Sequence, residues 1–190
     1  MTWMSNEQIQ SMGFASVGKN LKLSDKASFY NCQKIQLGNN VRIDDFCVLS
    51  AGVEGIEIGN YIHIGVFSSL IGAGNILLSD FCNISSRVSI YSSNDDYCGR
   101  CMTNPTIPLI YRNVQHDNVK IGRHVIIGSG SIVLPGTTLE EGAAVGALSL
   151  VKNSCISFGI YAGIPAKKIA MRRRDLLKFE QEMFDSMIEK

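Results

Sequence analysis

Two adjacent carboxylates and one histidine are the side chains of this sequence best suited to proton transfer. The stretch YSSNDDY holds Asp95 and Asp96, and NVQHDNV, farther along, holds His116 beside Asp117. Carboxylates and imidazoles serve as general bases, although a carboxylate needs a raised pKa to work near neutral pH. The competing interpretation is structural, because aspartates cap turns through their side chains and histidines occur in ordinary loops.

These groups need a scaffold, and the sequence contains a strict repeat. Residues 121–156 divide into six hexapeptides: IGRHVI, IGSGSI, VLPGTT, LEEGAA, VGALSL and VKNSCI. Each opens with an aliphatic residue and has a small or β-branched residue at its fifth place. Neither the helical period of 3.6 nor the strand period of 2 produces a repeat of six. The pattern predicts a triangular coil in which each hexad makes one short strand and one corner, with the opening aliphatic side chain inside.

The repeat extends upstream with small slips and defines the expected organisation. Coils begin at residues 17, 37, 58 and 78, but the pattern is lost between Asn94 and Val119. Long loops in a regular solenoid usually carry function. We expect an N-terminal cap at 1–16 and a repeat domain at 17–156, with a loop ejected from one of its corners at about 94–118. An exit segment at 157–190 should contain an amphipathic helix that packs on the coils or meets another subunit.

Composition limits the class of protein. The chain of 190 residues has 18 Lys and Arg against 17 Asp and Glu, which does not support binding to nucleic acid or to an anionic membrane. No stretch is apolar and long enough for a transmembrane helix, and no signal peptide is recognisable. Six cysteines fit thiols in a reducing cytoplasm. Many of the 18 glycines occupy the second place of a hexad, where we expect corner backbone with positive φ.

The hexads, together with the exit sequence AGIPAK at 162–167, resemble the hexapeptide-repeat acyltransferases over about residues 17–170. The resemblance implies an all-β fold, a left-handed parallel β-helix. Parallel crossovers are almost always right-handed, so the left hand depends on the resemblance alone. The ejected loop, SSNDDY and the exit are similar to the sugar O- and N-acetyltransferases. The similarity implies transfer of an acetyl or short acyl group from acyl-CoA to a hydroxyl or amino group of a free or nucleotide-linked sugar. It further implies a role in surface-polysaccharide (lipopolysaccharide O-antigen) biosynthesis, and a homotrimer that has its sites between subunits and uses no metal.

The same resemblance suggests roles for residues. Many relatives have a histidine base where the loop departs, but this loop begins without one. We therefore predict Asp95 or Asp96 as the base, with His116 as competitor. A carboxylate suits an amine acceptor better than a hydroxyl, because a neutral amine needs less help to attack. The implied coenzyme-binding residues are Ser129, Gly130, Ala147, Leu148, Lys167, Lys168 and Arg172, and the implied sugar-binding residues are Asn94, Tyr97, Thr103, Asn104 and Arg112.

Two other functions use the same coils. A γ-type carbonic anhydrase needs three zinc histidines between subunits, but two of the three histidines here, His63 and His124, fall at outward hexad places where we expect solvated side chains. A catalytically silent scaffold is the other alternative, favoured by the missing loop histidine. The loop also contains a CxxC sequence, Cys98 to Cys101, but no second pair completes a zinc site, and we predict no metal.

Overall fold

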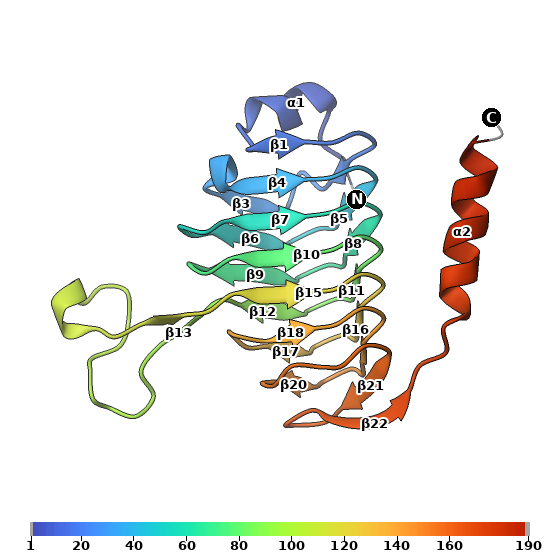
Figure 1. Ribbon diagram of the computed structural model, residues 1–190. Helices are drawn as coiled ribbons and strands as arrows, with labels where there is room; N and C mark the ends of the chain where they lie inside the picture. The colour runs from blue at the N-terminus through green and yellow to red at the C-terminus, as the bar shows by residue number, and fades with distance from the viewer. Residues whose placement is uncertain (1, 189–190) are drawn as a thin grey trace.

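The chain is a triangular coil with a loop projecting from one corner and a helix beside it, as seen in a computed structural model that describes residues 2–188 (Figure 1). Residues 1, 189 and 190, at the ends of the first and last expected segments, lie outside the described residues. No helix within residues 2–188 is both long and apolar enough to cross a bilayer.

Three sheets form the faces of the coil, and each complete coil contributes one strand to each face, while the second face also includes the last two strands. The first face contains β1 (Ser16–Val17), β4 (Ile35–Leu37), β7 (Ile56–Ile58), β10 (Ile76–Leu78), β15 (Val119–Ile121) and β18 (Thr138–Leu139). The second contains β2 (Lys22–Leu23), β5 (Val41–Ile43), β8 (Ile62–Ile64), β11 (Asn83–Ile84), β16 (Ile126–Ile127), β19 (Ala144–Val145), β21 (Gly159–Ala162) and β22 (Lys167–Met171). The third contains β3 (Ser28–Tyr30), β6 (Val48–Ala51), β9 (Ser69–Gly72), β12 (Ser89–Tyr91), β17 (Ile132–Val133) and β20 (Leu150–Val151).

Strands of successive coils pair in parallel, and the last pair of the second face, β21 with β22, is antiparallel. The stack continues past residue 156, where we expected the repeat to end, because β21 pairs with β19 of the preceding coil. At the other end, the short helix α1 (Asn6–Ser11) covers the first coil. Ser5 caps this helix in a capping box with Gln8, so a polar turn shields the first sheet edge.

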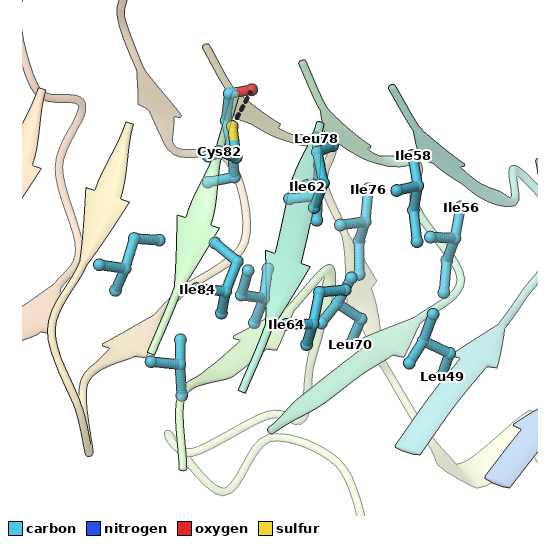
Figure 2. Packing of buried hydrophobic residues seen from close by; sticks show 14 of the residues in the cluster. Leu49, Ile56, Ile58, Ile62, Ile64, Leu70, Ile76, Leu78, Cys82 and Ile84 are labelled. Atoms are coloured by element: carbon cyan, nitrogen blue, oxygen red, sulfur yellow. Dashed lines mark hydrogen bonds between the residues drawn. The ribbon is translucent and has the colours of Figure 1, made fainter. Parts of the chain in front are cut away.

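Columns of aliphatic side chains fill the inside of the coil. Figure 2 shows isoleucines and leucines of neighbouring coils lying side by side, for example Ile84 next to Ile64. Each of the six opening residues of hexads 121–156 is at most 3% exposed. Their fifth-place partners, including Ser131 and Cys155, are buried as well. The strict hexad therefore exists because only its first and fifth places face the interior.

The glycines serve another purpose than the one we predicted. Positive φ falls at the fourth place of the hexads, where His124 (φ 58°) and Leu148 (φ 55°) lie, and not at the second. The second-place glycines instead allow neighbouring corners to approach closely. A Cβ on Gly122 would lie 2.8 Å from the backbone nitrogen of Glu141, closer than side-chain atoms come to backbone. The expectation of positive φ at these glycines was wrong, and the physical reason for them is the tight stacking of coils.

The loop leaves the corner that follows β12 and returns at β15, close to the expected range (Figure 1). Its two limbs pair as an antiparallel ribbon of β13 (Ser93–Asn94) and β14 (Gln115–His116). Beyond the ribbon, the loop contains the short 3-10 helix η2 (Leu109–Tyr111). A second 3-10 helix, η1 (Cys32–Lys34), lies at a corner near the N-terminal end.

Helix α2 (Asp175–Ile188) packs back on its own coils, which settles one of the two expected arrangements. It lies along a corner where the rings of Tyr61, Phe81 and His124 stack with centroids 4.9–5.0 Å apart. Phe184 meets Tyr61 and Phe81 edge-on. Glu180, which lies among the apolar residues of this amphipathic helix, pairs with His124 Nε2 at 2.7 Å and with Arg123. This polar residue therefore helps to dock the helix on the coils.

Replacing Phe184 by alanine is expected to weaken the docking of α2 by about 1–3 kcal/mol, because two aromatic contacts and part of the buried apolar area are lost. Hydrogen exchange of the α2 backbone should become faster in this variant. Phe179 is the matched control, since it lies on the same helix and is 64% exposed. If Phe179→Ala accelerates exchange as much as Phe184→Ala, the ring contacts do not hold the helix.

Candidate active site

Asp95 lies directly after the ribbon that anchors the loop. Within the ribbon, Ser93 faces His116 and Asn94 faces Gln115. The Ser93 hydroxyl and His116 Nδ1 are 2.8 Å apart and form a hydrogen bond. Two strands joined in this way fix where the loop begins, so the carboxylate that follows is positioned by backbone pairing as well as by the corner of the coil.

Two cavities meet at this carboxylate. One, of about 640 Å³, lies under the loop and is lined by Asp95 and Ser93 together with Ile71, Arg112 and His116 among others. The other, of about 430 Å³, lies against the outer side of the third face. Asp95 and Ser93 line it too, with Asn94, Tyr91, Tyr97, Ile132, Leu134 and Leu150. A single acidic side chain thus borders both cavities, and the smaller one has an apolar wall of Ile132, Leu134 and Leu150 facing its polar residues.

Asp96 has different surroundings, although it is the neighbour of Asp95. Its Oδ1 accepts hydrogen bonds from the backbone N–H and the thiol of Cys98, and its Oδ2 accepts one from the N–H of Cys101. These bonds hold the pKa of Asp96 below its usual range, with the Cys98 thiol contributing most. The Asp95 carboxylate has no hydrogen-bond partner within residues 2–188 and is exposed. Asp96 therefore stabilises the turn of the loop, whereas Asp95 is a free group at the cavities.

Comparisons with known proteins give this geometry a context. No family model matches the chain. A curated relative from Escherichia coli, dTDP-4-amino-4,6-dideoxy-D-glucose acyltransferase, is 57% identical over 188 residues, which cover 99% of this chain and 98% of the relative. The chain belongs to the hexapeptide-repeat sugar acyltransferases.

Solved structures support the same assignment for this acyltransferase. AntD, an N-acyltransferase from Bacillus cereus in complex with dTDP and 3-hydroxybutyryl-CoA, matches with a TM-score of 0.94 and 46% identity over 97% of both chains. A variant of AntD in which a serine is replaced by alanine, in complex with dTDP-4-amino-4,6-dideoxyglucose and coenzyme A, matches with a TM-score of 0.92 and 44% identity, over 97% of this chain and 98% of that one. The fold is accordingly the expected left-handed β-helix, and the protein transfers acyl groups from acyl-CoA to a sugar. The scaffold and carbonic anhydrase alternatives gain no support.

Four of the residues that the resemblance implied for coenzyme binding lie together on the acyltransferase. Ser129 and Gly130 form one corner, and Ala147 and Leu148 form the corner of the next coil, joined by the bond from Leu148 N–H to the Ser129 carbonyl at 2.9 Å. Leu148 is 71% exposed. These corners lead directly into β17 and β20, whose side chains Ile132 and Leu150 line the smaller cavity.

The basic residues of the exit segment divide into two kinds. Lys167 and Lys168 are exposed on β22, and the preceding Ala166 donates its N–H to the Leu150 carbonyl at 2.8 Å. Arg172 instead donates from Nη1 to the carbonyls of His124 and Gly142, at 2.7 and 3.1 Å. Burial lowers the pKa of the Arg172 guanidinium. The guanidinium is thus used to fasten the exit segment, whereas the two lysines point to solvent.

The residues implied for sugar binding are spread along the loop. Arg112 lines the larger cavity, and its Nε is buried with no hydrogen-bond partner among residues 2–188. Asn94 and Tyr97 line the smaller cavity, with Tyr97 88% exposed. Thr103 is exposed, and Asn104 accepts from Thr106 through its side-chain oxygen, so it shapes the turn of the loop. Neither Thr103 nor Asn104 lines these two cavities.

The other two histidines lie away from the loop, and neither is the solvated corner residue we expected. His63 contacts Asp44 through Nε2 at 2.8 Å and Asn83 through Nδ1 at 3.1 Å. Although burial opposes ionisation of Asp44, bonds from Arg42 and His63 outweigh it and lower the pKa of that carboxyl. The His124 side chain is only 10% exposed, because α2 covers it. Coverage by a distant segment is what the hexad pattern could not indicate.

Sequence reasoning missed the apolar wall of the smaller cavity. Ile132 and Leu150 occupy the outward sixth place of their hexads, and Leu134 occupies a second place. A signal was available, because aliphatic residues at outward places of a coil have no core to fill. Ser93 was missed as well, since its bond to His116 requires the two limbs of the loop to pair.

Proposed function

We propose that this protein transfers a short acyl group from acyl-CoA to the amino group of a dTDP-linked 4-amino-4,6-dideoxy sugar, for use in a surface polysaccharide. The observation that carries the proposal is the position of Asp95 at the junction of two cavities, where a donor and an acceptor can reach one carboxylate. The name of the Escherichia coli relative and the ligands of AntD support the choice of acceptor.

In the proposed reaction, the neutral amine attacks the thioester carbonyl carbon and a tetrahedral intermediate forms. Asp95 accepts the proton that the nitrogen loses, the carbon–sulfur bond breaks, and the coenzyme leaves as a thiolate that takes up a proton. A positioned base of this kind suits an amine, which is already a strong nucleophile when neutral. His116, held by Ser93, lies across the larger cavity and is the competing base.

We place the coenzyme along the outer side of the third face. Its pantetheine arm would lie on Ile132, Leu134 and Leu150, an apolar wall that a flexible aliphatic chain can cover. The corners Ser129–Gly130 and Ala147–Leu148 lie at the start of this wall, with Lys167 and Lys168 near its end for the phosphates. In this arrangement the coenzyme extends along the wall to Asp95, so its thioester end lies beside the carboxylate.

The acceptor is assigned to the larger cavity. Arg112 is a fitting partner for a diphosphate, because a guanidinium donates several hydrogen bonds to phosphate oxygens and its Nε has no partner in the described part of the chain. Asn94 and Tyr97 are assigned to the sugar near the carboxylate. Thr103 and Asn104 then act by shaping the loop.

Arg112→Lys should raise the KM for the nucleotide-sugar more than that for acyl-CoA.

We also propose a homotrimer with its sites between subunits, in a cytoplasmic location. The third face exposes aliphatic side chains and the loop projects far from its own coil, an arrangement that fits a loop lying against a neighbour (Figure 1). Six free cysteines fit a reducing compartment. Light scattering coupled to gel filtration measures the mass directly, and a monomer at micromolar concentration would contradict this part of the proposal.

Nitrogen rather than oxygen is expected to receive the acyl group. With the 4-amino sugar replaced by its 4-hydroxy counterpart on the same dTDP carrier, turnover should fall on the order of a hundredfold or more, because a hydroxyl depends far more on the base. Release of coenzyme A from acetyl- and 3-hydroxybutyryl-CoA, followed by mass spectrometry of the product, measures both preferences. Equal rates with the two sugars would overturn N-acylation.

A further inference from the structure

The loop carries a pair of cysteines next to the proposed site that the transfer reaction does not use. Cys98, Gly99, Arg100 and Cys101 follow Tyr97, which lines the smaller cavity. Cys98 is exposed and Cys101 is partly exposed, and both are free thiols. The spacing is that of CxxC pairs, which form and break disulfides in many proteins.

One carboxylate gathers both cysteines. Asp96 accepts the Cys98 thiol at 2.6 Å and the backbone N–H groups of Cys98 and Cys101 at 2.9 Å each. Arg100 also contacts Cys98, with Nε 2.9 Å from the sulfur. A cation beside an exposed sulfur is typical of the surroundings of reactive cysteines. The turn therefore holds the Cys98 thiol close to one acidic and one basic group, and it bonds the backbone of Cys101 to the same carboxylate.

The remaining thiols lie in surroundings that disfavour the thiolate. Cys47, Cys82 and Cys155 lie inside the coil, and burial raises the pKa of these thiols to about 11, 12 and 11, respectively. Burial also raises the pKa of Cys32, which lies at the corner of η1. Since the thiolate is the species that attacks a disulfide, an oxidant at neutral pH should reach the loop pair first.

We propose that Cys98 and Cys101 form a reversible disulfide that switches the loop between an active and an inactive state. A low-molecular-weight disulfide, such as oxidised glutathione, is the oxidant. The two cysteine thiols lose two protons and two electrons, one sulfur–sulfur bond forms, and the oxidant is reduced to two thiols. The Cys98 thiol then no longer donates to Asp96, so the turn that follows Asp95 loses the contact that shapes it.

Incubation with oxidised glutathione tests the switch. The expected product is a protein lighter by two hydrogen atoms, with a single peptide-mapped link between Cys98 and Cys101. Transfer activity should fall on the order of tenfold to a hundredfold, the cost of misplacing a catalytic group slightly, and dithiothreitol should restore it. Formation of the link is measured by mass alone, so it stands or falls independently of the proposed reaction; only the activity change depends on that function.

Three variants make the test specific. Cys98→Ser and Cys101→Ser should retain the basal activity and lose the response to oxidant, and the serine hydroxyl at 98 can still donate to Asp96. Cys32→Ser, outside the loop, should respond like the unsubstituted protein. Glutathione attached separately to each sulfur, or a linked protein with full activity, would overturn the proposal.

Discussion

Replacing Asp95 by asparagine is expected to lower kcat by about 10²- to 10⁴-fold, the usual contribution of a positioned general base. The carboxamide has nearly the same shape but cannot accept the proton of the attacking amine. Asp95 has no hydrogen-bond partner within residues 2–188, so the loop should keep its form and both KM values should change little. Steady-state kinetics with acyl-CoA and the dTDP-amino sugar measure the two parameters separately.

Asp96 provides the matched control, one residue away. Asp96→Asn keeps the size of the side chain but weakens the bonds to Cys98 and Cys101. The loop turn should loosen, raising KM while kcat stays within about tenfold of the original, since no proton-transfer group is lost. His116→Ala tests the competing base. If Asp95→Asn retains full kcat while His116→Ala loses it, the base is the histidine and our assignment fails.

Replacing Ile84 by alanine is expected to destabilise the protein by about 2–5 kcal/mol, the range for removing a large aliphatic side chain from a packed core. Ile84 is fully buried and lies between Ile64 and Ile127 in one inward column, so the cavity left behind has stacked neighbours on both sides and little room to collapse (Figure 2). Urea unfolding, followed by circular dichroism at a fixed protein concentration, measures the loss.

Ile169 is the control for this experiment, because it is the same residue type on β22 and is 66% exposed. Ile169→Ala should change the free energy of unfolding by less than about 0.5 kcal/mol. Comparable losses in the two variants would mean that the inward columns are not the main source of stability.

The fold could be predicted from the sequence because the hexad is a direct record of which side chains face inward. Ile121, Ile127 and Val133 recur at the spacing of the coil, and each meets its equivalent in the next coil by parallel pairing. The place where the repeat is interrupted likewise indicated the loop. The role of the second-place glycines was harder to predict, because close approach between coils depends on how corners stack and not on the conformation of one residue.

The candidate site was predictable only in part. Composition and motif singled out Asp95, Asp96 and His116, but the two aspartates are equivalent in the sequence, and the hydrogen bonds that Asp96 accepts within its own turn distinguish them. His124 is a further example, because its place in the hexad predicted an exposed side chain whereas α2 covers it.

The sequence by itself therefore determined the coil, the corner from which the loop departs and the short set of groups able to move a proton, because these depend on a local period and on residue type. The tertiary structure alone decided which carboxylate stays free, which apolar side chains wall the second cavity, and which basic residue is already occupied by carbonyls. The first depends on how the loop turn folds around Asp96, and the others arise from contacts between residues far apart in the chain, such as Arg172 with Gly142, which no local pattern encodes.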